Sequence, residues 1–167
     1  MPDAGPERSL VRGAKLDHVA VAVRDIAAAA SLYRDVLGGE FLYGADQPDE
    51  GFRFVQYRFP GGGKVELVTP IADGFLTRFL HERGEGLHHV TFRVSELEVQ
   101  VERLRAGGLE PVLVNLRDES WKEAFIHPRD ARGVLIQLAE SPHGDDTTAR
   151  HLADAFPEAA LLAPADR

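Results

Sequence analysis

The sequence contains no cysteine among its 167 residues. This absence excludes disulfide bonds, thiolate nucleophiles and zinc sites built on cysteine. Any metal ion must therefore be held by nitrogen and oxygen atoms of histidine, carboxylate or amide side chains.

Basic residues are outnumbered, and long apolar runs are missing. There are 19 lysines and arginines against 27 aspartates and glutamates, which gives a formal net charge of −8. Such a balance argues against nucleic acid or an anionic membrane surface as partner, although local arginines could bind a small anionic substrate. No stretch is long enough to cross a bilayer, and residues 1–13 lack the apolar core of a secretory signal. We expect a cytoplasmic protein.

Two segments of the chain repeat each other. LDHVAVAVRDI at 16–26 resembles LHHVTFRVSEL at 87–97, and KVELVTP at 64–70 resembles LIQLAESP at 135–142. Both matches have the same offset of 71 residues, from 18 to 89 and from 66 to 137. One shared offset indicates a duplicated module.

Each copy has the pattern of a strand, a helix and three further strands. The sequence predicts an α+β protein in which two βαβββ modules, about 16–70 and 87–140, form a curved mixed-sheet cup with helices outside. A helix at about 74–83 joins the modules within one domain of residues 14–140. Ser95 and Glu98 have the spacing of a capping box at the start of the second module's helix. Residues 1–13 and 141–167 are expected to be tails, with a helical turn near 147–156.

Adjacent histidines open the repeated strand of the second module. Neighbouring strand residues point to opposite faces, so His88 and His89 cannot serve one site. His89 alternates with the apolar residues Val90, Phe92 and Val94, so we expect it to face away from the helix. His88 has the parity of the buried residues. His18 in the first module corresponds to His89.

The last strand of each module adds one polar residue by the same alternation. Glu66 and Gln137 point away from the apolar neighbours that face the helices. With His18 and His89 they should project from the concave face of the sheet. Two imidazoles, one carboxylate and one amide oxygen suit a divalent ion such as cobalt, nickel, manganese, iron or zinc.

Four segments resemble the vicinal oxygen chelate superfamily, namely LDHVAVAV, VELVTP, FLHERGEGLHHVTFRV and FIHPRDARGVLIQL. Within it they are similar to the methylmalonyl-CoA epimerase branch, and the resemblance spans about 16–140. It implies a metal held by His18, Glu66, His89 and Gln137. It also implies an enzyme that inverts the carbon alpha to a thioester, such as that of an acyl-CoA, through a metal-stabilised enolate. By analogy we expect a homodimer.

The sequence departs from that branch where proton transfer is concerned. Epimerases usually carry Glu at the position of Gln137, and the strand FRFVQYRF at 52–59 lacks the expected acidic base. The candidate catalytic carboxylates are therefore Glu50, Glu66 and Glu123. Arg93 has the parity of His89, so it is either a substrate-binding residue or a solvated arginine at the strand edge.

Other functions of the superfamily stay open. A glyoxalase-like lyase would also require Glu at position 137. A ring-cleaving dioxygenase would need two histidines and one carboxylate, which His18, His89 and Glu66 could supply. A non-catalytic binding protein of the resistance type would be expected to lack the ligand positions. The remaining histidines, His81, His127, His143 and His151, have no partner at ligand spacing.

Overall fold

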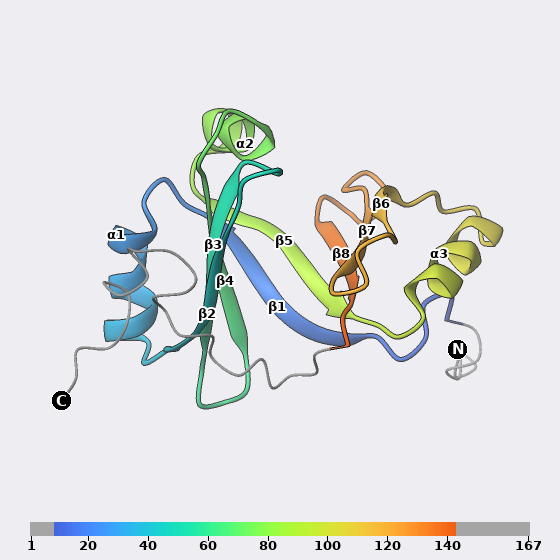
Figure 1. The fold of residues 1–167 in the computed structure, drawn as a ribbon, viewed down its shortest axis with the longest axis horizontal. Coiled ribbons are helices and arrows are strands. Elements are labelled where there is room, and N and C mark those ends of the chain that lie inside the picture. Colours follow the sequence, from blue (N-terminus) through green and yellow to red (C-terminus); the bar gives the residue numbers. More distant parts are fainter. Residues whose placement is uncertain (1–8, 143–167) are drawn as a thin grey trace. The chain divides into compact units, whose positions relative to one another are not determined.

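Two βαβββ copies follow one another along the chain in the computed structural model, which describes residues 9–142 (Figure 1). The first contains β1 (Lys15–Ala22), α1 (Ile26–Ala30), the π-helix η2 (Ser31–Val36), β2 (Glu40–Gln47), β3 (Phe52–Arg58) and β4 (Lys64–Pro70). After α2 (Phe75–Arg83), the second contains β5 (Gly86–Arg93), α3 (Leu97–Ala106), β6 (Val112–Asn115), β7 (Lys122–Ile126) and β8 (Leu135–Glu140). The expected α+β class with mixed strand pairing is confirmed.

The described residues divide into two units. The first unit is residues 18–88, and the second unit is residues 9–17 together with 89–142. Both boundaries fall inside strands, so β1 and β5 each contribute residues to both units. The expected tail at 1–13 is described only from residue 9. The expected helical turn near 147–156 lies outside the described residues.

The strand order in the first unit is β2-β3-β4-β1. Strand β1 runs parallel to β4, whereas β3 is antiparallel to both β2 and β4. The register sets Ala20 opposite Glu66 and Gln56 opposite Glu66. Because residues in register point to the same side, these positions share one face of the sheet.

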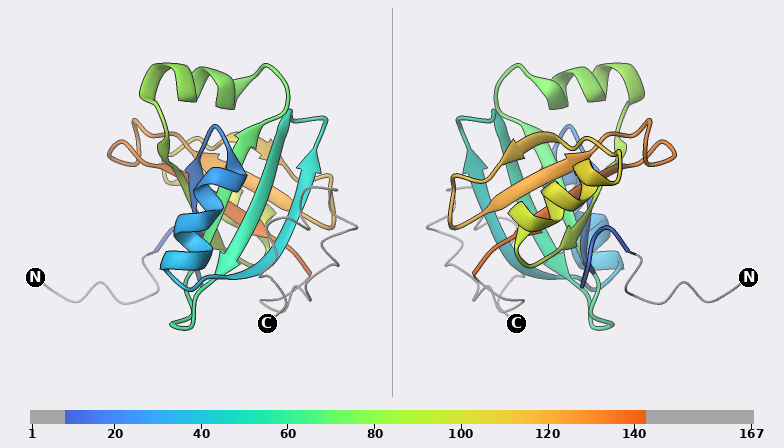
Figure 2. Two further views of the ribbon diagram at one scale, coloured as in Figure 1. Left: turned by 90° about the vertical axis from the view of Figure 1, so that its left-hand side faces the viewer. Right: turned by 90° about the vertical axis from the view of Figure 1, so that its right-hand side faces the viewer.

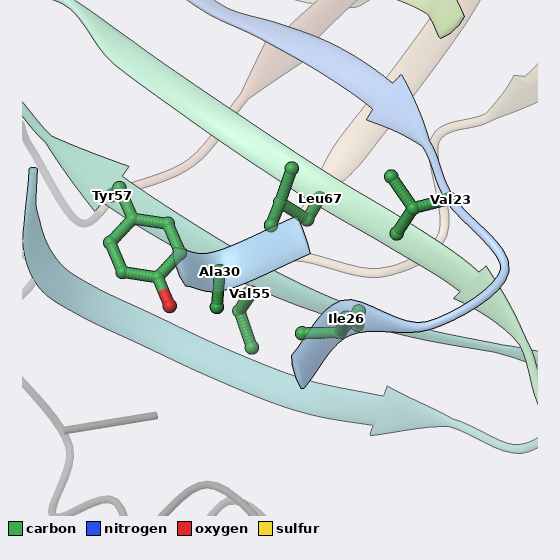
Figure 3. Packing of buried hydrophobic residues seen from close by; sticks show 6 residues of the cluster. All are labelled: Val23, Ile26, Ala30, Val55, Tyr57 and Leu67. Carbon is green, nitrogen blue, oxygen red and sulfur yellow. The ribbon is translucent and has the colours of Figure 1, made fainter. Parts of the chain in front are cut away.

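Helix α1 covers the opposite face of the first unit's sheet (Figure 2). Asp25 caps the helix, since its side chain accepts a hydrogen bond from the backbone N–H of Ala28 at 3.1 Å. The helix and strands share one apolar cluster, drawn in Figure 3 and made of Val23, Ile26, Ala30, Val55, Tyr57 and Leu67. Burial of these side chains is the main force that holds the helix on the sheet.

Helix α2 lies on the face of the first unit's sheet that carries His18. Its Leu76 and Leu80 are buried and pack in one cluster with Ala22, Phe54 and Val68. The sequence predicted a linking helix at about this place. The structure shows in addition that the helix closes one part of this face with apolar side chains.

The second unit repeats the plan with the strand order β5-β8-β7-β6. Strand β5 is parallel to β8, and β7 is antiparallel to β8 and β6. Helix α3 covers one face of these strands (Figure 2). Its buried contacts form the cluster Val94, Leu97, Val101, Leu104, Ala124 and Leu138.

The predicted capping box at α3 is wrong. The helix is preceded by Glu96, which has a left-handed backbone with φ of 52° and makes no side-chain cap. The Glu140 carboxylate at the end of β8 instead accepts hydrogen bonds from the backbone N–H groups of Glu96 and Leu97, at 3.2 and 2.9 Å. An anionic acceptor at a helix N-terminus satisfies its free N–H groups and its dipole together.

None of the helices within residues 9–142 combines the length and the apolar character that crossing a bilayer requires.

Candidate metal centre

A buried histidine and a buried carboxylate meet in the first unit. His18 in β1 is 2% exposed, and Glu66 in β4 is 8% exposed. His18 has the same parity as Ala20, which is in register with Glu66. The side chains therefore point to the same side, with His18 Nε2 3.7 Å from Glu66 Oε2.

A third side chain holds the carboxylate of Glu66. Gln56, directly opposite on β3, donates from Nε2 to Glu66 Oε2 at 2.7 Å. Withdrawing a carboxylate from water is costly unless hydrogen bonds, a cation or a metal ion compensates. A buried carboxylate oxygen beside a histidine nitrogen is a pair of donor types that a divalent metal ion binds.

The second unit presents a matching pair. His89 in β5 is 8% exposed and Gln137 in β8 is 6% exposed. The His89 ring lies edge-on to Phe125, with centroids 6.3 Å apart. Thr91, two residues after His89, is in register with Gln137, as is Phe125. These residues thus share the face that is opposite to the α3 cluster.

Two hydrogen bonds fix the amide of Gln137. The hydroxyl of Thr91, which is fully buried, donates to Gln137 Oε1 at 2.6 Å. Gln137 Nε2 donates to Glu123 Oε2 at 2.7 Å. The same carboxylate oxygen accepts from Trp121 Nε1 at 3.1 Å. Since a carboxylate only accepts, Glu123 turns the amide nitrogen toward itself and the amide oxygen away.

Arg93 takes part in the same network. Its Nη2 is 3.5 Å from Asp17 Oδ1, and the Asp17 side chain is almost fully buried. The guanidinium carbon lies 5.1 Å from the centroid of the Trp121 ring, within the range of a cation–π contact. Arg93 is thus anchored on a buried acid and an indole, unlike a solvated arginine at a strand edge.

His88 has surroundings unlike those of His89. Its ring packs against two aromatic rings of α2, at 5.7 Å from Phe75 and 4.9 Å from Phe79. Burial disfavours the imidazolium and lowers the pKa of His88 to about 4. The structure therefore separates the two adjacent histidines as strand alternation requires, with His88 in the aromatic contacts of α2.

The other carboxylate candidate, Glu50, lies in the turn between β2 and β3. Its side chain is exposed, and its backbone N–H donates to the carbonyl of Gln47 at 3.1 Å. Among the minor histidines, His81 and His127 are exposed, whereas His143 and His151 lie outside the described residues.

Sequence reasoning missed Gln56, Thr91 and Trp121. Gln56 and Glu66 are equally distant from Gly61 in the turn PGGGK, so a hairpin register centred on that glycine would have paired them. Thr91 follows His89 by two residues, which is the signal for the same face of a strand. Trp121 carries no such signal, because it precedes β7 and approaches Glu123 only through its indole N–H.

Several known proteins resemble this chain in sequence. Residues 17–125 match the family model of the Glyoxalase/Bleomycin resistance protein/Dioxygenase superfamily. The mitochondrial methylmalonyl-CoA epimerase of Mus musculus is 35% identical over 135 residues, which cover 76% of this chain and 73% of that protein. The uncharacterized protein YqjC of Bacillus subtilis is 37% identical over 134 residues, covering 78% of this chain and 94% of that protein.

A solved structure extends the likeness to the fold. The methylmalonyl-CoA epimerase from Mycobacterium tuberculosis is 35% identical and has a TM-score of 0.72, with 81% of this chain and 92% of that chain covered. The expected family membership is confirmed. The chain belongs to the Glyoxalase/Bleomycin resistance protein/Dioxygenase superfamily, and within it resembles methylmalonyl-CoA epimerases.

Proposed function

We propose that the chain is a metal-dependent isomerase. Its reaction is the removal and return of the proton on the alpha carbon of a thioester, as in the epimerases it resembles. The observation that carries this proposal is the buried His18–Glu66 pair, repeated as His89 and Gln137 at duplicated positions. The relatives named methylmalonyl-CoA epimerase supply the reaction type and indicate an acyl-CoA as substrate.

We assign the metal ligands to His18, Glu66 and His89, with Gln137 as the fourth. The first three are buried and of metal-binding types. The donor set contains two nitrogens and two oxygens with one negative charge, which fits a divalent transition metal. When bound, such an ion polarises a carbonyl oxygen and stabilises the negative charge that develops as the alpha proton leaves.

Proton transfer is assigned to Glu123. It lies on β7 with its carboxylate hydrogen-bonded to Gln137, on the face of the second unit that carries His89. Glu50 is the weaker candidate because its side chain is exposed in a turn. Glu66 already accepts from Gln56 and lies beside His18, so its role is that of a ligand. Arg93, held by Asp17, is proposed to meet the anionic part of the substrate.

The direct test is exchange of the alpha hydrogen in deuterated water. The cobalt-loaded protein is incubated with a panel of acyl-CoA thioesters that includes methylmalonyl-CoA, and deuterium uptake is followed by mass spectrometry. At saturating cobalt, Glu123→Gln should slow exchange by about 100-fold or more, since general acid–base groups contribute on that order. The matched control is Glu119→Gln, an exposed carboxylate in the preceding loop.

The outcomes separate the assignments. Loss of exchange in Glu50→Gln rather than in Glu123→Gln would move the base to the β2–β3 turn. No exchange with any thioester, despite bound cobalt, would refute the isomerase.

A second candidate is supported by the ligand types themselves. His18, His89 and Glu66 are two histidines and one carboxylate, the set used by non-haem iron oxygenases. Consumption of oxygen by the Fe²⁺-loaded protein with a catechol panel would favour this function over the isomerase.

We further propose a homodimer, by analogy with proteins of this fold. Light scattering coupled to size-exclusion chromatography tests the oligomeric state, and a monomeric mass would overturn it.

A further inference from the structure

Each unit of the chain contains one glutamine–glutamate contact between neighbouring strands, and the two contacts have opposite polarity. In the first unit the last strand carries the carboxylate, Glu66, and β3 carries the amide, Gln56. In the second unit the last strand carries the amide, Gln137, and β7 carries the carboxylate, Glu123. Both contacts measure 2.7 Å between Nε2 and Oε2.

We propose that Glu123, in addition to the proton transfer assigned to it above, positions Gln137 so that the amide oxygen faces the metal site. Its contact with Gln137 corresponds to the contact between Gln56 and Glu66, with the amide and the carboxylate exchanged between the strands. The inference rests on the metal site proposed above and is independent of the substrate. An unrestrained glutamine amide can present either its oxygen or its nitrogen, and only the oxygen binds a metal. Glu123 removes this ambiguity because its carboxylate can only accept from the nitrogen.

Two further contacts keep Glu123 in place. Trp121 donates from Nε1 to the oxygen that also accepts from Gln137. The indole ring is in turn covered by the guanidinium of Arg93, which pairs with the buried Asp17. On the other side of the amide, the buried hydroxyl of Thr91 donates to Gln137 Oε1. This hydrogen bond fits the same orientation of the amide, with its nitrogen toward Glu123.

The sharpest test exchanges the amide and the carboxylate between positions 123 and 137. Glu123→Gln replaces the carboxylate by an amide, which can donate as well as accept. Only Trp121 then favours an acceptor oxygen at this place, so the selection of the Gln137 oxygen as ligand is weakened. Gln137→Glu places two carboxylates side by side, which repel each other. The double variant Glu123→Gln/Gln137→Glu restores an amide–carboxylate contact with the polarity of the first unit. If the contact positions the ligand, the double variant should recover what each single variant loses.

Cobalt binding is measured without substrate by the visible absorption of Co²⁺ and by quenching of Trp121. Trp121 is the only tryptophan in the chain, so its fluorescence reports on this network alone. Glu123→Gln should weaken Co²⁺ binding by about 10- to 100-fold, the effect typical of residues that orient a ligand. The double variant should return to within a few-fold of wild type, and the control Glu119→Gln should match wild type.

Several results would overturn the proposal. One is an unchanged Co²⁺ affinity and absorption spectrum in Glu123→Gln. Another is a double variant that binds no better than the weaker single variant, with urea unfolding of the metal-free proteins showing that all are folded. Absence of Co²⁺ binding by the wild type would remove the metal site and this role together. Normal Co²⁺ binding without thioester exchange would refute only the isomerase.

Discussion

The adjacent histidines His88 and His89 permit a matched pair of substitutions that tests the site directly. Both residues belong to β5 and differ by one position, so replacing either by alanine removes the same ring from the same strand. His89 belongs to the proposed metal centre, whereas His88 packs on Phe75 and Phe79 of α2. His89→Ala should therefore abolish metal binding, and His88→Ala should leave it intact.

The expected thermal shift can be worked out. A divalent ion at about 100 times its dissociation constant adds about 2.7 kcal/mol to the free energy of unfolding. For a folded body of roughly 130 residues, an unfolding entropy of about 2.1 cal/mol/K per residue converts this into a rise in Tm of about 10 °C. Loss of the two ring contacts of His88 should lower the starting Tm by roughly 4–11 °C, because aromatic contacts contribute about 0.5–1.5 kcal/mol each.

The assay is a melting curve with and without Co²⁺ for both variants. His88→Ala should start lower and still rise by about 10 °C, while His89→Ala should rise by no more than a degree or two. Equal loss of the shift in both variants would show that the assignment of strand faces is wrong. A full shift in both would show that His89 is not a ligand.

Three stability predictions concern the frame of the site. The Tyr57 hydroxyl is buried without a hydrogen-bond partner among the described residues, and burial raises its pKa to about 12. In the unfolded chain the Tyr57 hydroxyl has a pKa near 10, so the stability from this group is complete below pH 10 and falls above it, by about 1.4 kcal/mol at pH 11. Tyr57→Phe should abolish this loss when urea unfolding is compared at pH 8 and 11. An equal loss in the variant and the wild type would contradict the assignment. Leu67→Ala should cost about 2–5 kcal/mol in urea unfolding, because the side chain is fully buried under α1, and a cost below about 1 kcal/mol would contradict the packing. Glu140→Gln should cost about 0.5–1 kcal/mol, because the anionic cap of the N–H groups of Glu96 and Leu97 becomes neutral; an unchanged midpoint would argue against that cap.

The duplicated module could be predicted because its signals are local or periodic. Alternation in β1 and β5 gave the faces of His18 and His89, and the shared offset of 71 residues linked Glu66 to Gln137. The capping of α3 could not be predicted, because the true cap, Glu140, is 43 residues away from Leu97. A local pattern contains no information about a partner that only tertiary structure brings near.

For a similar reason the sequence did not predict where α2 lies. Nor did it predict the contacts of Thr91 and Glu123 with Gln137. Leu76 and Leu80 have the four-residue spacing of any amphipathic helix, which does not say which face of a sheet the helix covers. The contacts of Gln137 with Thr91 and Glu123 join strands that are distant in sequence. Their geometry depends on the register of β5, β7 and β8.

The distribution of carboxylates leads to a stereochemical prediction for the proposed isomerase. Inversion needs an acid and a base on opposite faces of the substrate carbon. Among the described residues we assign one such group, Glu123, since Glu66 serves as a ligand and Gln137 cannot accept a proton at neutral pH. A proton removed and returned by the same carboxylate preserves the configuration, while the proton exchanges with solvent.

We therefore expect deuterium uptake from solvent to be faster than inversion when a single enantiomer of the thioester is supplied. The measurement compares uptake by mass spectrometry with the change in configuration by chiral chromatography of the released acid. The double variant Glu123→Gln/Gln137→Glu should lose most of the deuterium uptake, since its new carboxylate occupies a ligand position and Glu123 is gone. Equal rates of uptake and inversion in the wild type would instead require a second proton donor on the opposite face, and the assignment of Glu123 as the single acid–base group would be wrong.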